Sequence, residues 1–304
     1  MENSRGLLRW WVYQKERFPL AQYVPMVFAF SFCAVSYSAH LREGKFSWIA
    51  LVVAFVSSLV FFMLLRIADE FKDREDDARY RPYRPVPRGL VKLSELALIG
   101  VALVALQVIV VAFYEPRLLV YLAIVWLFFA LMSKEFFVAT WLKRHPTLYL
   151  ISHMMIMPLI DLFATACDWL IVGEKQYPAF VLIGFLAASF FNGAVIEIGR
   201  KIRAKEAEEA GVETYTVIWG NRRAVFTWLA VLSGALLTAL VAAHAVGVLL
   251  AGSVLLIVMF LICLYYAIAF LKTPIVQFSK MIERLSGLWT MVVYVSLATL
   301  PFFV

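Results

Sequence analysis

Long apolar segments alternate with short charged ones along the whole chain. A helix that crosses a bilayer needs about 18 or more predominantly apolar residues. Nine segments meet or approach that length, near residues 21–41, 46–65, 94–114, 118–133, 147–167, 177–197, 224–244, 248–271 and 285–303. The pattern predicts an all-α, polytopic membrane protein, in which residues 1–304 form one domain of nine transmembrane helices around a central cavity.

The composition excludes an ordinary soluble protein. Hydrophobic residues make up 63% of the chain, whereas about 45–50% is usual for soluble domains, and the mean hydropathy is +0.83. The three cysteines, Cys33, Cys167 and Cys263, are far apart and lie in or beside apolar segments. Their spacing predicts neither a metal site nor a disulfide framework.

Lysine and arginine residues gather on one side of the predicted membrane. With the N-terminus in the cytoplasm, 24 of the 28 fall in cytoplasmic segments and only Arg42, Lys45, Arg117 and Lys175 on the opposite side. Because basic residues favour the cytoplasmic side, we expect a bacterial inner-membrane protein with a cytoplasmic N-terminus and a C-terminus on the opposite side. Anionic lipids or substrates then account for the net charge of +7, and no nucleic acid is expected as a partner.

The most informative polar segment is the first loop, residues 66–93. Asp69, Asp73 and Asp77 are four residues apart, so on a helix they would drift only about 40° per step and share one face. Carboxylates at a membrane boundary suit a hard divalent cation. We expect these three side chains to bind magnesium, or manganese in its place, and to be the catalytic residues. The alternative is a solvated charge run beside a membrane helix.

An arginine- and proline-rich turn follows the aspartates directly. Prolines at positions 82, 85 and 87 stop a helix and fix an extended turn. A guanidinium fork fits phosphate oxygens, so Arg84 is a candidate phosphate-binding residue. Most neighbouring arginines are instead expected to anchor the chain at lipid headgroups.

The first loop resembles the first signature of the UbiA superfamily of intramembrane prenyltransferases, roughly N-D-x-x-D-x-x-x-D followed by R-P-x-P-x-G. Asp73 and Asp77 fall on its second and third acidic positions, and Asp69 replaces the asparagine. Three further matches are the R-P-x-P-x-G element from Arg84 to Gly89, the basic pair Lys143 and Arg144, and the stretch from Gly211 to Gly220.

The resemblance implies a polyprenyl diphosphate whose tail lies in a cavity open to the membrane. It also implies magnesium bridging the diphosphate to two aspartate motifs. The C–O bond would ionise towards an allylic carbocation, which an acceptor nucleophile attacks. On this interpretation the protein is a transferase of lipid biosynthesis with an isoprenoid diphosphate donor and an acceptor that the sequence does not identify.

The second loop, residues 198–223, departs from the family pattern. Arg203 and Ala207 stand where the family usually has the aspartates of D-x-x-x-D. Nearby are Glu197, Arg200 and Lys201. One interpretation makes Glu197 a metal ligand and lets Arg200, Lys201 and Arg203 bind phosphate directly, because a cation can replace a metal beside an anion. In the other, the second metal site is lost and the donor is different, or catalysis is absent.

The basic residues of the second loop are also compatible with a different donor. A soluble phosphorylated donor such as phosphoribosyl diphosphate, with a lipid phosphate as acceptor, suits this loop. Lys143 and Arg144 belong to a third loop, residues 134–144. They would either contact phosphate from this loop or fix the orientation of the chain in the membrane.

Polar residues inside apolar segments usually face a cavity. Asn192, His153 and Asp161 are therefore candidates for lining the cavity and binding the acceptor. The alternative is a satisfied hydrogen bond in the interior. A transporter or a non-catalytic lipid-binding protein also remains possible from the sequence, although a transporter is expected to carry more charged groups at mid-membrane.

Overall fold

The computed structural model describes residues 6–172 and 182–303, and within them every regular element is helical. Eight of the described helices are long and apolar enough to cross a membrane. They are α2 (Leu20–Leu41), α3 (Trp48–Lys72), α5 (Leu93–Tyr114), the consecutive pair α8 (Pro146–Met154) and α9 (Ile156–Val172), α10 (Leu182–Gly199), α11 (Tyr215–Ala245), α12 (Leu249–Lys272) and α13 (Val276–Thr299). The ninth apolar helix, α6 (Leu118–Ser133), has only 16 residues. The all-α, polytopic fold is thus confirmed, and in the described part of the chain its apolar helices comprise eight long spans and this short one.

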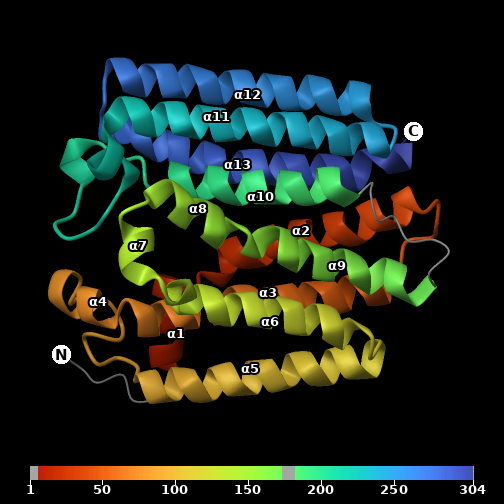
Figure 1. Cartoon of the computed structure of the whole chain (residues 1–304), viewed down its shortest axis with the longest axis horizontal. Helices are drawn as coiled ribbons and strands as arrows, with labels where there is room; N and C mark the ends of the chain where they lie inside the picture. The colour runs from red at the N-terminus through yellow and green to blue at the C-terminus, as the bar shows by residue number, and fades with distance from the viewer. Residues whose placement is uncertain (1–5, 173–181, 304) are drawn as a thin grey trace.

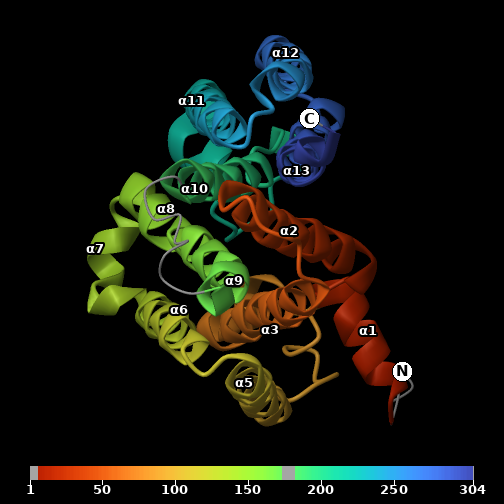
Figure 2. The same ribbon diagram turned by 90° about the vertical axis from the view of Figure 1, so that its right-hand side faces the viewer.

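The helices run side by side along the long axis of the molecule (Figure 1). Helix α2 packs against α3, α9 and α13, while α10 packs against α9, α11 and α13. Helices α5 and α12 lie at the two outer edges (Figure 2). The largest side chains of the core, Trp228 and Trp289, are fully buried, so the apolar periodicity of the sequence becomes a continuous packed interior.

The charged segments collect at one end of this bundle. Figure 1 shows α1 (Leu8–Arg17), α4 (Arg74–Tyr80), α7 (Ala139–Lys143) and the connection between α10 and α11 at that end, with the end of α13 opposite. This gathering is the structural counterpart of the predicted charge asymmetry. Lys175, which the prediction placed on the far side, lies outside the described residues.

Several helices extend beyond the apolar segments that predicted them. Helix α3 continues to Lys72 and α13 begins at Val276, because a helix need not end where the hydrocarbon layer does, whereas the extension of α11 back to Tyr215 is separated from the rest of that helix by a kink at Gly220 (φ 77°). The apolar segment predicted near residues 147–167 forms two consecutive helices, α8 and α9, which are separated at Met155. Pro158, the proline inside this segment, does not interrupt the helix. Pro158 falls in the first turn of α9, where the missing N–H has no helical acceptor.

Candidate active site

The first and second loops pack against each other at the polar end of the bundle. The hydroxyl of Tyr83 donates to the carboxylate of Glu209 at 3.0 Å. Gly211 has a φ of +75°, and a Cβ atom added to it would lie 2.3 Å from the ring of Tyr80. Only glycine therefore allows this turn to approach the ring so closely.

The three aspartates of the first loop keep a helical spacing across the junction of two helices, because the backbone N–H of Asp73 donates to the carbonyl of Asp69 at 2.9 Å and that of Asp77 to the carbonyl of Asp73 at 2.8 Å. Helix α3 ends at Lys72, and Asp73 (φ −89°, ψ 9°) separates it from α4. The carboxylate of Asp69 pairs with Arg66 at 3.2 Å. The partly buried Asp73 has no ion-pair partner among the described residues. Burial, followed by the charges of Asp69 and Asp77, raises the pKa of Asp73, which is the environment in which a carboxylate gains most from a bound cation.

Asp77 differs from Asp73 because its carboxylate is already surrounded by cations. It is buried and pairs with Arg84 at 2.7 Å and with Arg81 at 2.8 Å. These contacts hold the arginine–proline turn against α4. Asp77 therefore fixes the guanidinium of Arg84 in place.

The second loop brings a carboxylate and two cations together at the end of α10. The helix ends at Gly199, and Arg200 and Lys201 follow it directly. The carboxylate of Glu197 pairs with Arg200 at 2.5 Å and with Lys201 at 2.9 Å. Glu197 is therefore engaged by cations, like Asp77.

Arg203 lies further along the second loop and is held by other contacts. Its guanidinium pairs with Glu209 at 3.3 Å, and its backbone N–H donates to the hydroxyl of Thr216 at 3.1 Å. Glu208 accepts hydrogen bonds from Thr214 at 2.7 Å and from Thr216 at 2.6 Å. The Gly211 stretch thus closes the loop into a hydrogen-bonded turn.

Arg200 connects the second loop to the first electrostatically. Its pKa is raised, chiefly by Glu197 and also by Asp69 of α3 and by Tyr23 of α2. Arg66, the partner of Asp69, donates to the hydroxyl of Tyr23 at 3.1 Å. The ends of α2, α3 and α10 therefore converge on one charged region.

A further polar cluster joins α3 to the segment between α6 and α8. The ammonium of Lys72 pairs with the carboxylate of Glu135 and donates to the hydroxyl of Tyr149 at 2.7 Å. His153 Nε2 lies 3.2 Å from Glu135, and the rings of Tyr149 and His153 stack with centroids 3.9 Å apart. His153 therefore faces a carboxylate in this cluster.

The backbone of this segment is unusual. Glu135, Phe136 and Phe137 have φ values of 50°, 51° and 61°, a left-handed conformation that is unfavourable for side chains with a Cβ. Burial alone would raise the pKa of Glu135, but hydrogen bonds from His153 and Lys72 lower it to about 2. Sequence reasoning did not bring Lys72 into this cluster, because Lys72 is far from Glu135 and His153 in the chain.

The remaining predicted site residues lie in two different environments. Lys143 and Arg144 are exposed at and directly after α7, at the polar end of the bundle (Figure 1). Asp161 and Asn192 are instead buried between helices. Asp161 accepts a hydrogen bond from Tyr294 at 3.1 Å, and Asn192 accepts one from Trp289 at 3.0 Å. Their acceptor-binding role stays a prediction.

The described residues contain no group of three or more histidine, cysteine, aspartate or glutamate side chains placed to hold a metal. Asp69 and Asp73 nevertheless fit a magnesium ion, because magnesium usually takes one or two protein carboxylates and leaves other positions to water and substrate phosphates. The unpaired carboxylate of Asp73 is the observation that supports this fit.

The sequence matches the model of a known protein family. The model of the UbiA prenyltransferase family matches residues 26–274, which is most of the chain. The chain belongs to this family. Among proteins with curated functions, none matches the sequence significantly.

Solved structures share the fold of the UbiA family member at low sequence identity. A UbiA homologue from Aeropyrum pernix K1 is 14% identical, with a TM-score of 0.65 over 88% of this chain and 94% of that one. A digeranylgeranylglyceryl phosphate synthase structure is 14% identical, with a TM-score of 0.63 over 94% and 99% of the two chains. A UbiA homologue from Archaeoglobus fulgidus, bound to DMAPP and Mg²⁺, is 16% identical, with a TM-score of 0.52 over 90% and 99%.

One acidic residue of the UbiA signature escaped the sequence analysis. Glu70 follows Asp69 and stands at the first acidic position of the first signature. It is buried and pairs with Arg17 of α1. Of the acidic residues in this signature, only Asp73 is thus left without a cation partner among the residues described.

Proposed function

We propose that the protein transfers a prenyl group from an isoprenoid diphosphate to an acceptor nucleophile at the polar end of the bundle. The observation that carries this proposal is the unpaired, partly buried carboxylate of Asp73, which lies between Asp69 and the arginine–proline turn. Membership of the UbiA family supports prenyl transfer. The Archaeoglobus fulgidus homologue with bound DMAPP and Mg²⁺ supports a diphosphate donor.

Asp69 and Asp73 would hold magnesium, or manganese in its place. When bound, the ion would supply positive charge that stabilises the diphosphate as it leaves. Asp77 was expected as a third ligand, but we assign it the positioning of Arg84, because its two oxygens already face guanidinium groups.

Cations from three segments would bind the phosphate oxygens. Arg84 comes from the first loop and Arg200 and Lys201 from the second, with Lys143 and Arg144 of the third segment nearby at the same end (Figure 1). The contacts of Tyr80 and Tyr83 with the second loop hold these cations together. Transfer breaks the allylic C–O bond, with its electron pair leaving on the diphosphate, while the acceptor forms the new bond to carbon and loses its proton.

A second donor class is favoured by one specific observation, the composition of the second loop. Arg203 and Ala207 occupy the positions of the usual aspartates, and the side chain of Arg200 is 47% exposed. A soluble phosphorylated donor such as phosphoribosyl diphosphate, with a lipid phosphate as acceptor, would use these cations in place of a second metal. A transport role has less support, because most of the cations that could bind an anion lie at one end of the bundle.

The test is thermal stabilisation of the purified protein by farnesyl, geranylgeranyl and phosphoribosyl diphosphates and by a long polyprenyl phosphate, each with and without magnesium. A ligand that binds only the folded protein raises the melting temperature by mass action. We expect a magnesium-dependent shift with a prenyl diphosphate. A shift with phosphoribosyl diphosphate alone would replace the donor assignment. No shift with any ligand would contradict both donor proposals.

A further inference from the structure

The N-terminal helix α1 is an element that the apolar pattern of the sequence did not reveal. It has only 10 residues, Leu8–Arg17, and two residues separate it from the transmembrane helix α2. Figure 2 shows α1 projecting sideways from the bundle rather than continuing along it. Because α2 enters the membrane directly after this turn, α1 lies at the level of the membrane boundary.

The inner face of α1 is attached to the first loop and its surroundings by three ion pairs. Arg17 pairs with Glu70 of α3, and both side chains are buried. The guanidinium of Arg9 makes a two-pronged contact with Glu95 at the start of α5, at 2.6 and 3.2 Å. Glu16 receives a similar contact from Arg88 of the arginine–proline turn, at 2.8 and 3.0 Å. Helix α1 is thereby fixed to both ends of the first loop.

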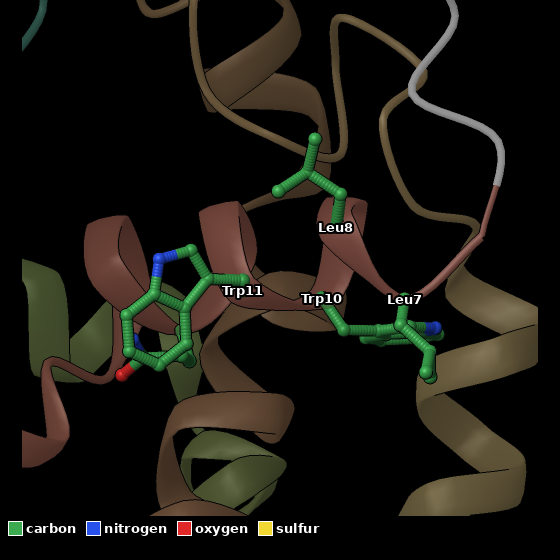
Figure 3. A pocket seen from close by; sticks show the side chains of 5 residues that line it. Leu7, Leu8, Trp10 and Trp11 are labelled. Carbon is green, nitrogen blue, oxygen red and sulfur yellow. The ribbon is translucent and has the colours of Figure 1, made fainter.

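The outer face of α1 is apolar and exposed among the described residues. Leu7, Leu8 and Trp11 are 88%, 62% and 55% exposed. Together with Trp10 and Gln14 they line a shallow pocket, in which Figure 3 shows Leu8 and Trp11 directed away from the helix. The ammonium of Lys15 lies 5.8 Å from the centre of the Trp11 ring, so the exposed face combines apolar side chains with a cation.

This combination matches one kind of partner, the surface of an anionic bilayer. Interfacial helices place leucine and tryptophan among the acyl chains and lysine at the headgroups. Anionic headgroups attract basic residues, and α1 lies at the end of the bundle where the basic segments gather (Figure 1). Because only Phe18 and Pro19 separate α1 from α2, a bilayer that surrounds α2 would reach this face.

We propose that α1 docks on the anionic lipid surface and holds the arginine–proline turn in position from there. Lipid contact would fix the outer face of α1, and the ion pairs of Arg9, Glu16 and Arg17 would transmit that restraint to Glu95, Arg88 and Glu70. This inference goes beyond the proposed function, and its test uses no transfer activity. The inference does not depend on which donor the protein uses.

The docking test places nitroxide spin labels on the full-length protein in phospholipid nanodiscs. Cysteine is introduced by Leu8→Cys or Trp11→Cys, and the native cysteines are all buried. Val254→Cys on the exposed side of α12 is the lipid-facing reference, and Glu206→Cys in the second loop is the aqueous reference. Collisions with oxygen report lipid contact, and collisions with a nickel chelate report water.

We expect the oxygen-to-nickel accessibility ratio at positions 8 and 11 to resemble that at position 254 and to exceed that at position 206 several-fold. A ratio like that of position 206 would overturn the docking surface. Labels shielded from both reagents would also overturn it, because protein would then cover this face.

The coupling test follows hydrogen exchange of residues 81–90 in discs of phosphatidylcholine with and without phosphatidylglycerol. We expect slower exchange in the anionic discs and loss of that difference in Lys15→Glu. Lys280→Glu reverses an exposed charge at the same end of the bundle and should retain the difference. Equal exchange in the two lipids, or equal effects of the two variants, would overturn the coupling.

Discussion

The two loops that meet at the polar end differ in how their carboxylates are paired with cations. In the first loop, Glu70 and Asp77 are neutralised by arginines while Asp73 has no such partner among the described residues. In the second loop, Glu197 is shared by Arg200 and Lys201. The first loop therefore presents a carboxylate to a cation, and the second presents cations to an anion.

On the proposed function, this difference would let a UbiA family member bind phosphate without the usual second aspartate motif. Phosphate oxygens need positive charge, and either a metal or a guanidinium can bring it. Here the paired acid Glu197 holds Arg200 and Lys201 at the end of α10, and Arg203 takes one of the aspartate positions. Four predictions test the contrast between the loops.

The largest effect is expected from Asp73→Asn. Removing the unpaired carboxylate should lower magnesium-dependent turnover at least about a hundredfold, because several kcal/mol of charge stabilisation are lost with the metal. Turnover and magnesium-dependent thermal shift are the measurements. Asp76→Asn removes an exposed neighbouring charge and is the control. Equal activity in the two variants would contradict the assignment of a magnesium site to the first loop.

Asp77→Asn should act mainly on stability and on the position of Arg84. Arg81 and Arg84 would lose their buried partner, which we expect to destabilise the protein by about 2–4 kcal/mol, since both arginines keep some contact with solvent. Thermal unfolding in detergent measures the change, with Glu75→Gln on the exposed side of α4 as the control. If Asp77→Asn unfolds like the wild type yet loses magnesium binding, Asp77 is a ligand after all.

Arg200→Gln tests the cationic second loop. Losing one charged hydrogen bond to phosphate costs about 1.5–3 kcal/mol, so donor affinity should fall roughly ten- to a hundredfold. The loss should be similar with and without magnesium, unlike that in Asp73→Asn. Calorimetric titration of the donor measures it, with the exposed Arg222→Gln of α11 as the control. Equal affinities would show that the second loop does not bind the donor.

The smallest effect concerns the contact that joins the loops. Gly211→Ala and Gly89→Ala both place a Cβ on a backbone with φ near +75°, but only Gly211 lies against the Tyr80 ring. Each should lose about 1 kcal/mol from the backbone, and Gly211→Ala should lose more because the ring must move. Melting temperatures measure the difference. Tyr80→Ala should restore part of the loss only at position 211, and equal losses in the two alanine variants would refute the close contact.

The sequence was most informative where neighbouring residues decide the structure. Apolar runs predicted the membrane helices, and prolines 82, 85 and 87 predicted the turn that follows Tyr80, the last residue of α4. The predicted aspartate ladder is divided between α3, which ends at Lys72, and α4, but the backbone hydrogen bonds from Asp73 to Asp69 and from Asp77 to Asp73 keep its helical spacing. The sequence did not predict which cations pair with the carboxylates of this loop, because a partner such as Arg17 lies in a distant segment.

The long apolar segments were enough to predict the membrane class and the approximate number of helices, because burial in lipid requires such segments whatever their partners, and the positions of lysine and arginine predicted the gathering of charge at one end. The cation that each carboxylate pairs with became visible only in the folded structure. Glu70 is joined to Arg17, and Glu135 to Lys72 and His153, by contacts between segments far apart in the chain. A charged side chain acquires its role from the groups around it after folding, which its position in the sequence does not reveal.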